Sequence, residues 1–174
     1  KYKTVVRLKG GDPMLFGRAM EEIDALENAH IEYEVVPGIT AALAASADLK
    51  ISLTERGLAR SVTIATPRVG ADEKENHWMH DATASDTTVL YMGVGKSAEI
   101  VEALIAQGRR ADTPVVVVEN ASLPIMRKFV TTLDGLRDAS SWGITGPAIV
   151  MLGEVYRRAE QAAENIDQRI SSAR

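Results

Sequence analysis

Short runs of β-branched and apolar residues recur along the chain and predict strands. They are bounded by glycine, proline, asparagine or charged residues, as buried strands commonly are. The predicted strands are residues 5–8, 31–36 ("IEYEVV"), 61–66 ("SVTIAT"), 87–93 ("TTVLYMG"), 114–120 ("PVVVVEN"), 127–133 ("RKFVTTL") and 148–155 ("AIVMLGEV").

Helical periodicity fills several of the intervals between these runs. Residues 17–30 place Met20, Ile23 and Leu26 on one face, and residues 39–49 form an alanine-rich helix. Residues 97–108 predict a helix with Ser97 as N-cap and Gly108 just past its end. Strands that alternate with helices favour an α/β fold with a largely parallel sheet.

The sequence also predicts what lies at the two ends of the chain and between its lobes. A strand that begins within a few residues of Lys1 needs a partner, so we expect an N-terminal portion of the protein to precede this chain. The segment "ISLTERGLAR" reads as a connection between two lobes, and the charged residues 157–174 predict an exposed helical tail.

Composition narrows the chemistry. A net charge of −4 argues against nucleic acid as the main partner, and no apolar run approaches a membrane span. The absence of cysteine removes disulfides and thiolate chemistry. His77 and His80 form an i,i+3 pair without an evident third ligand, so we expect no metal site.

Glycine or small polar residues follow several apolar runs: Gly10-Gly11-Asp12, Gly38, Gly93 and Asn120-Ala121. In open α/β sheets the ligand crevice lies beyond the carboxyl ends of the strands, where glycine lets backbone groups approach a ligand. The "GGDP" turn matches neither the G-x-G-x-x-G fingerprint nor a Walker loop. No Ser-His-Asp constellation is present. These residues indicate either a small-molecule site or simple turns.

Four motifs in order, "VVRLKGGDPMLFGR", "EVVPGITAA", "LYMGVG" and "PVVVVENAS", resemble the tetrapyrrole methylase family, and within it the branch that methylates uroporphyrinogen III. The resemblance implies a two-lobe, class III S-adenosylmethionine-dependent methyltransferase fold whose N-terminal lobe is incomplete here. Residues 1–56 would be the remainder of the N-terminal cofactor and substrate lobe, 57–156 the C-terminal α/β lobe, and 157–174 the tail.

The resemblance also implies cofactor contacts, carried over residue by residue. They are Gly10, Gly11, Asp12, Leu15, Thr40, Ala41, Met92, Ala121 and Ala148. Asp12 would accept a hydrogen bond from a ribose hydroxyl or an amino group. The residues that transfer protons are expected before residue 1, so no catalytic residue is assigned in this chain.

The implied reaction is methylation of uroporphyrinogen III at C2 and C7 to give precorrin-2, on the route to sirohaem and cobalamin. The cofactor would lie in a cleft between the lobes of a cytoplasmic homodimer. The carboxylate-rich substrate would require arginines, for which the candidates are Arg7, Arg18, Arg56, Arg60 and Arg68.

Two alternatives stay open. The family usually reads "GRGGEE", "GIPLTHRG" and "TGH" where this chain has "GRAMEE", "KISLTERG" and "TPR". Changes such as Glu55 in place of histidine leave room for a later precorrin as substrate, whereas "RLKGGDP" argues against the diphthine and ribosomal-RNA branches. The other alternative is a truncated module that binds cofactor or tetrapyrrole without turnover.

Overall fold

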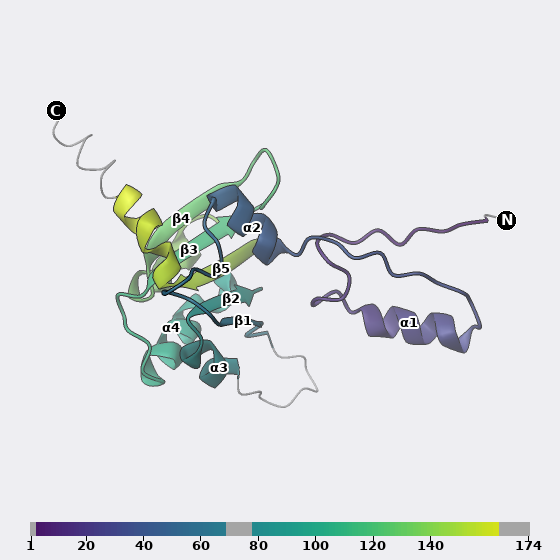
Figure 1. Ribbon diagram of the computed structural model, residues 1–174, viewed down its shortest axis with the longest axis horizontal. Coiled ribbons are helices and arrows are strands. Elements are labelled where there is room, and N and C mark those ends of the chain that lie inside the picture. The colour runs from purple at the N-terminus through teal and green to yellow at the C-terminus, as the bar shows by residue number, and fades with distance from the viewer. Residues whose placement is uncertain (1–2, 69–77, 164–174) are drawn as a thin grey trace. The chain divides into compact units, whose positions relative to one another are not determined.

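The computed structural model describes residues 3–68 and 78–163 and divides the chain into two compact units, Lys1–Ala44 and Ala45–Arg174 (Figure 1). The division falls earlier in the chain than the lobe boundary expected after residue 56. The assignment of the lobes therefore stays a prediction, and each unit is described by itself.

The first unit contains one complete helix, α1 (Ala19–Asn28), flanked by extended segments (Figure 1). The strands predicted at 5–8 and 31–36 are wrong, because neither segment forms a strand in the structure. Their apolar side chains are exposed, with Val5 82%, Leu8 84% and Val36 70% accessible. A run of apolar residues becomes a strand only when another strand satisfies its backbone groups, and the described chain supplies none there.

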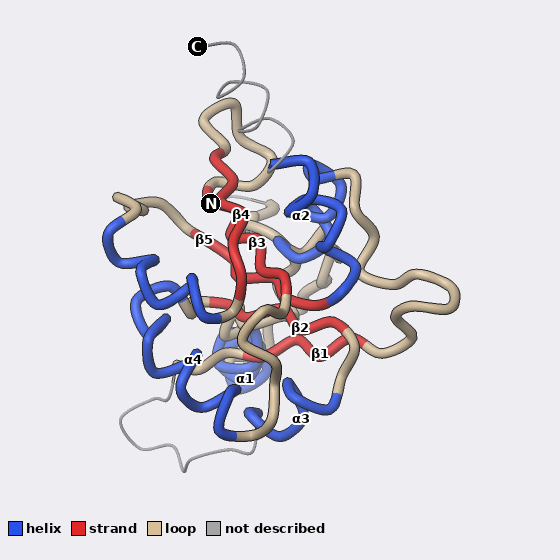
Figure 2. The backbone as a smooth tube through the Cα atoms, turned by 90° about the vertical axis from the view of Figure 1, so that its left-hand side faces the viewer, coloured by secondary structure: helices blue, strands red, loops and turns tan. Residues whose placement is uncertain are grey.

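The second unit is built on a five-stranded sheet in the order β1-β2-β5-β3-β4 (Figure 2). The strands are β1 (Val62–Ala65), β2 (Thr87–Tyr91), β3 (Pro114–Glu119), β4 (Arg127–Thr132) and β5 (Ala148–Gly153). These confirm the five predicted strands after residue 60. The helices are α2 (Ala41–Leu49), which begins in the first unit, α3 (Trp78–Ala84) and α4 (Ser97–Ala106), with 3-10 turns η1 (Val94–Lys96), η2 (Asp134–Ser141) and η3 (Glu154–Tyr156).

The expectation of a largely parallel sheet is wrong. Only β1 and β2 pair in parallel, while the β2–β5, β5–β3 and β3–β4 pairs are antiparallel. Helix α4 does return the chain in the same direction from β2 to β3, as the alternating pattern predicted. However, β5 lies between these two strands with the opposite direction. Insertion of a late strand leaves no local sequence signal, because it depends on long-range pairing.

One face of the sheet carries the main core. Residues of α3, α4 and η2 pack with alternate residues of β2, β3 and β5; the fully buried members include Ala82, Leu90, Val101, Leu104, Val117, Leu136 and Val150. Residues on the other face, such as Val89, Val116 and Met151, are buried as well. A central strand covered on both faces reads as a continuous apolar run, which explains "PVVVVE".

The helices predicted at residues 17–30, 39–49 and 97–108 correspond to the shorter helices α1, α2 and α4. Ser97 is the first residue of α4 and Lys96 is its N-cap, so the N-cap prediction is wrong. Gly108 follows the C-cap Gln107 with φ +96°, as predicted for the residue just past the helix. Helix α3 was not predicted. Residues 157–163 of the expected tail are helical, and 164–174 lie outside the described residues. In the part that is described, no helix has the length and apolar character needed to cross a bilayer.

Replacing Leu104 with alanine should lower the free energy of unfolding by about 2–5 kcal/mol. Leu104 has no exposed surface and lies in the cluster that α4 packs against the sheet. Trp78 and Trp142, the only tryptophans, both pack against this cluster, so their fluorescence in a urea titration follows this unit. Leu123→Ala, at a side chain 52% exposed, is the control. Equal effects of the two substitutions would contradict the assigned core.

Candidate functional site

Strand direction brings three of the carried-over residues to one edge of the sheet. β2 and β3 both run antiparallel to β5, so their carboxyl ends meet the amino end of β5. The register pairs Tyr91 with Ile149 and Glu119 with Ala148. Met92 directly follows β2, Ala121 is the second residue after β3, and Ala148 begins β5. These residues, predicted from separate motifs, therefore lie at a common edge.

The backbone turns sharply where β2 and β3 end. Met92 has φ +56° and Asn120 has φ +54°, in the left-handed region that residues with a side chain seldom adopt. Ser122 is left-handed as well, and its amide donates to the Asp48 carboxylate at 2.7 Å. Strained non-glycine residues persist where surrounding contacts hold them, and they cluster at functional sites. This edge is therefore the candidate binding edge of the second unit.

In the first unit, one carboxylate joins the two predicted cofactor turns. Asp12 Oδ1 accepts a hydrogen bond from the Met14 amide at 2.8 Å, and Oδ2 accepts one from the Gly38 amide at 2.9 Å. The "GGDP" turn is thereby tied to the "PGIT" turn, which lies far along the chain. In the structure each Asp12 oxygen is bonded to a backbone amide of the protein itself. The role of Asp12 as an acceptor for a ribose hydroxyl stays a prediction.

Glycine allows these two turns to lie in contact. A Cβ atom at Gly38 would be 2.1 Å from the Gly11 carbonyl oxygen, so no side chain fits there. Gly11 has φ +74° and lies beside the amino end of α2, where a Cβ would be 3.8 Å from the Ala41 nitrogen. Backbone N–H groups at a helix start favour negative charge. The Ala41 amide at the start of α2 thus lies close to Gly11, with Thr40 adjacent.

Lys9 binds the end of the "GGDP" turn that leads into α1. Lys9 Nζ donates to the Gly17 carbonyl and forms an ion pair with Glu22 at 2.7 Å. Its side chain is mostly buried, unlike a typical surface lysine. Leu15, predicted as an apolar cofactor contact, lies within this turn, and its amide donates to the Asp12 carbonyl at 3.3 Å. The segment from Gly10 to Gly17 is therefore a closed turn held at both ends.

The hydrogen bond from Gly38, with a second from Met14, holds the pKa of Asp12 below its ordinary value. A lowered folded-state pKa means that the contact stabilises the folded state fully above about pH 4, and that this contribution is lost as pH falls through the folded pKa. We expect the Gly38 amide chemical shift to titrate with a midpoint below the ordinary pKa of an aspartate side chain. A midpoint at or above that value in an NMR titration would contradict the Asp12–Gly38 contact.

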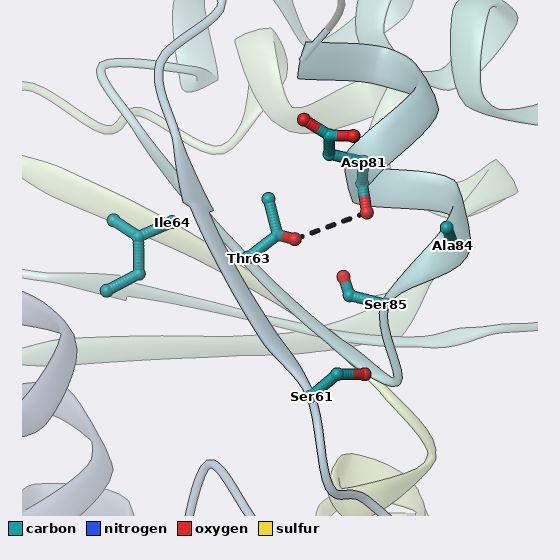
Figure 3. A pocket seen from close by; sticks show the side chains of 6 residues that line it. All are labelled: Ser61, Thr63, Ile64, Asp81, Ala84 and Ser85. Atoms are coloured by element: carbon teal, nitrogen blue, oxygen red, sulfur yellow. Dashed lines mark hydrogen bonds between the residues drawn. The ribbon is translucent and has the colours of Figure 1, made fainter.

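A separate hollow lies between β1 and α3, away from the predicted cofactor contacts. It is lined by Ser61, Thr63, Ile64, Asp81, Ala84 and Ser85 (Figure 3). Its three hydroxyl groups are committed within the fold: Thr63 donates to the Asp81 carbonyl, Ser61 to Asp86, and Ser85 to the Thr87 carbonyl. The hollow begins at the amino end of β1, opposite the binding edge, and its hydroxyl groups serve the fold.

The predicted substrate arginines differ in their surroundings. Arg7 forms an ion pair with Glu22 at 3.4 Å, and Arg18 forms one with Glu21. Arg68 instead lies just past the carboxyl end of β1, with a guanidinium nitrogen 4.0 Å from the Met92 sulfur. Arg68 is therefore placed beside a predicted cofactor contact.

Two features of the site were not predicted from the sequence. The tie between Asp12 and Gly38 has no local signal, because it joins residues far apart in the chain. Glu119 was also missed, although its position could have drawn attention to it: an acid directly follows four valines in the most apolar strand. Among the described residues no group of three acids or histidines is arranged to hold a metal; His77 lies outside those residues.

The chain resembles proteins of known function over most of its length. Residues 1–137 match the profile of the family described as tetrapyrrole (corrin/porphyrin) methylases. A uroporphyrinogen-III C-methyltransferase of Pseudomonas aeruginosa is 44% identical over 156 residues, which cover 89% of this chain and 63% of that protein. A siroheme synthase of Zymomonas mobilis is 44% identical over 88% of this chain and 32% of its own length.

A solved structure shows the same fold. The uroporphyrin-III C-methyl transferase of Thermus thermophilus, complexed with S-adenyl homocysteine, superposes with a TM-score of 0.76 at 35% identity, covering 90% of this chain and 68% of that one. The chain thus spans about two thirds of the length of the methyltransferases it matches.

Proposed function

Because the chain belongs to the tetrapyrrole (corrin/porphyrin) methylase family, we propose that it serves S-adenosylmethionine-dependent methylation of uroporphyrinogen III at C2 and C7, giving precorrin-2. This proposal rests on the exposure and the location of the nine predicted cofactor contacts. None of them is fully buried, and each lies in a turn, at a strand end or at a helix start.

The residues present fit the cofactor. A Cβ at Gly10 would meet no protein atom within 4 Å, so the space beside this backbone is open to a ligand. Backbone N–H groups at Gly11 and at the start of α2 would suit a carboxylate or hydroxyl oxygen, and Leu15 of the same unit would supply apolar contact. In the second unit, Met92 would supply apolar contact at the binding edge. When bound, S-adenosylmethionine supplies a methyl group activated by its sulfonium.

The residues of this chain would bind and orient rather than act as nucleophiles. Methyl displacement requires the accepting carbon to be aligned behind the methyl group, so holding both partners provides much of the rate enhancement. Arg68, beside Met92, would bind a substrate carboxylate near the reacting centre. The Thermus thermophilus structure with bound S-adenyl homocysteine supports S-adenosylmethionine as the cofactor.

A later precorrin is the second candidate substrate. The family's usual histidine is replaced by Glu55, and the Glu55 carboxylate accepts a hydrogen bond from Arg158. An acid committed to an ion pair at that position alters the charge that a tetrapyrrole would meet. We also propose that the protein acts as a homodimer in the cytoplasm, which light scattering on the purified chain and fluorescence microscopy would test.

The deciding experiment has two stages. Calorimetry with S-adenosylhomocysteine tests binding, and incubation with methyl-labelled S-adenosylmethionine and uroporphyrinogen III tests transfer, beside an active methyltransferase as control. Binding with label in the tetrapyrrole supports the proposal. Transfer only to a later precorrin selects the second candidate, binding without transfer indicates a binding module, and failure to bind overturns the proposal.

A further inference from the structure

Glu119 is a buried acid at the end of the most apolar strand. It follows Val115–Val118 in β3, and its side chain is 1% exposed. Buried carboxylates are rare unless charged partners and hydrogen bonds offset the loss of hydration. The contacts of Glu119 therefore indicate what the residue does.

The Glu119 carboxylate binds one backbone segment and one arginine side chain. Oε1 accepts hydrogen bonds from the Thr145 amide at 2.8 Å and from the Gly146 amide at 2.6 Å. Oε2 accepts one from Arg127 Nε at 2.6 Å. Arg127 also donates to the Gly143 carbonyl at 2.6 Å, so the glutamate and the arginine together hold the loop from 143 to 146.

This loop leads directly into the binding edge. Gly146 is followed by Pro147 and Ala148, and the Pro147 carbonyl accepts a hydrogen bond from the Asn120 amide at 2.9 Å. A Cβ at Gly146 would be 2.3 Å from the Asn120 side-chain oxygen, so the two segments are in close contact. The segments that carry Ala121 and Ala148 are thus fixed to each other next to one carboxylate.

We propose that Glu119 is a positioning residue for the cofactor: it holds the 145–148 segment against the Asn120–Ala121 turn so that both backbones face the ligand. This inference rests on the proposed function. Glu119 is not a catalytic residue, because its oxygens are bonded to the protein's own backbone and to Arg127.

The charge of Glu119 is essential to this role. The Gly146 amide, with further hydrogen bonds from Thr145 and Arg127, lowers the pKa of Glu119, so the group is ionised at neutral pH. All of its partners are donors, and a carboxylate only accepts. A glutamine of nearly the same size would have to turn its NH₂ group toward one of these donors. That mismatch would displace either Arg127 or the 145–146 amides.

Glu119→Gln should raise the dissociation constant for S-adenosylhomocysteine about tenfold, as expected for loss of a charged hydrogen bond network. The matched control is Glu102→Gln, which removes an exposed partner of Arg137 and should leave affinity unchanged. Amide hydrogen exchange at Thr145 and Gly146 should accelerate in Glu119→Gln only. If Glu119→Gln fails to fold, Arg127→Lys is tested in its place. The Arg127 side chain is 47% exposed, and this substitution should raise the dissociation constant about threefold.

The outcomes separate this inference from the proposed function. If the parent chain binds S-adenosylhomocysteine and the tested position-119 or position-127 variant binds as tightly as Glu102→Gln, the positioning role is overturned and the proposed function stands. If the parent chain does not bind S-adenosylhomocysteine, the proposed function fails and the positioning role fails with it. Weaker binding together with faster exchange at both amides, in a folded variant, supports the role.

Discussion

Replacing Gly38 with alanine is expected to weaken binding of S-adenosylhomocysteine by about 100-fold or more while the five-stranded sheet stays folded. The added Cβ would lie 2.1 Å from the Gly11 carbonyl oxygen and 3.4 Å from the Asp12 Cα. The nearest of these atoms belong to backbone, so no side-chain rotation can relieve the contact. The "GGDP" and "PGIT" turns would have to separate, and the hydrogen bond from Gly38 to Asp12 would be lost.

Two measurements isolate this effect. Calorimetry gives the affinity, and tryptophan fluorescence in urea follows the sheet-bearing unit, which contains both tryptophans. Gly108→Ala is the matched control, since a Cβ there would meet no atom within 4 Å. Unchanged affinity in Gly38→Ala would show that the contact between the two turns is not needed for binding.

Gly11→Val is expected to cause a comparable loss of affinity for a different reason. A Cβ at this position would lie 3.7 to 3.8 Å from backbone atoms of residues 39–41, at ordinary contact distance. We expect the larger valine side chain to obstruct the backbone approach proposed for the cofactor. The φ of +74° adds a backbone cost of about 1–2 kcal/mol for any residue with a side chain.

The control for Gly11→Val separates strain from obstruction. Gly108 also has positive φ, at +96°, with open space around it. It follows α4 and precedes the amino end of β3, so it lies opposite the candidate binding edge of the second unit. Gly108→Val should lose stability from strain but keep its affinity. If Gly11→Val binds as tightly as Gly108→Val, the placement of the cofactor beside Gly11 is wrong.

The residues of the candidate site could be proposed from the sequence because they lie in contiguous motifs. "GGDP", "PGIT", "YMG" and "ENAS" each combine an apolar run with residues that tolerate unusual backbone angles, and local sequence encodes such turns. Met92 and Asn120 illustrate the limit of this signal, since both adopt left-handed angles without being glycine. Only the surrounding contacts, such as the Asn120 amide donating to Pro147, explain why they do so.

The sequence by itself determined the helices α1, α2 and α4, the five strands of the sheet and the family, because periodicity and short motifs are local properties. The tertiary structure alone decided that β5 lies between β2 and β3, that residues 5–8 and 31–36 form no strand, and that Asp12 and Glu119 each join distant backbone segments. Strand pairing and buried carboxylate contacts depend on which segments meet in space. A one-dimensional pattern identifies the groups that need partners but does not specify the partners.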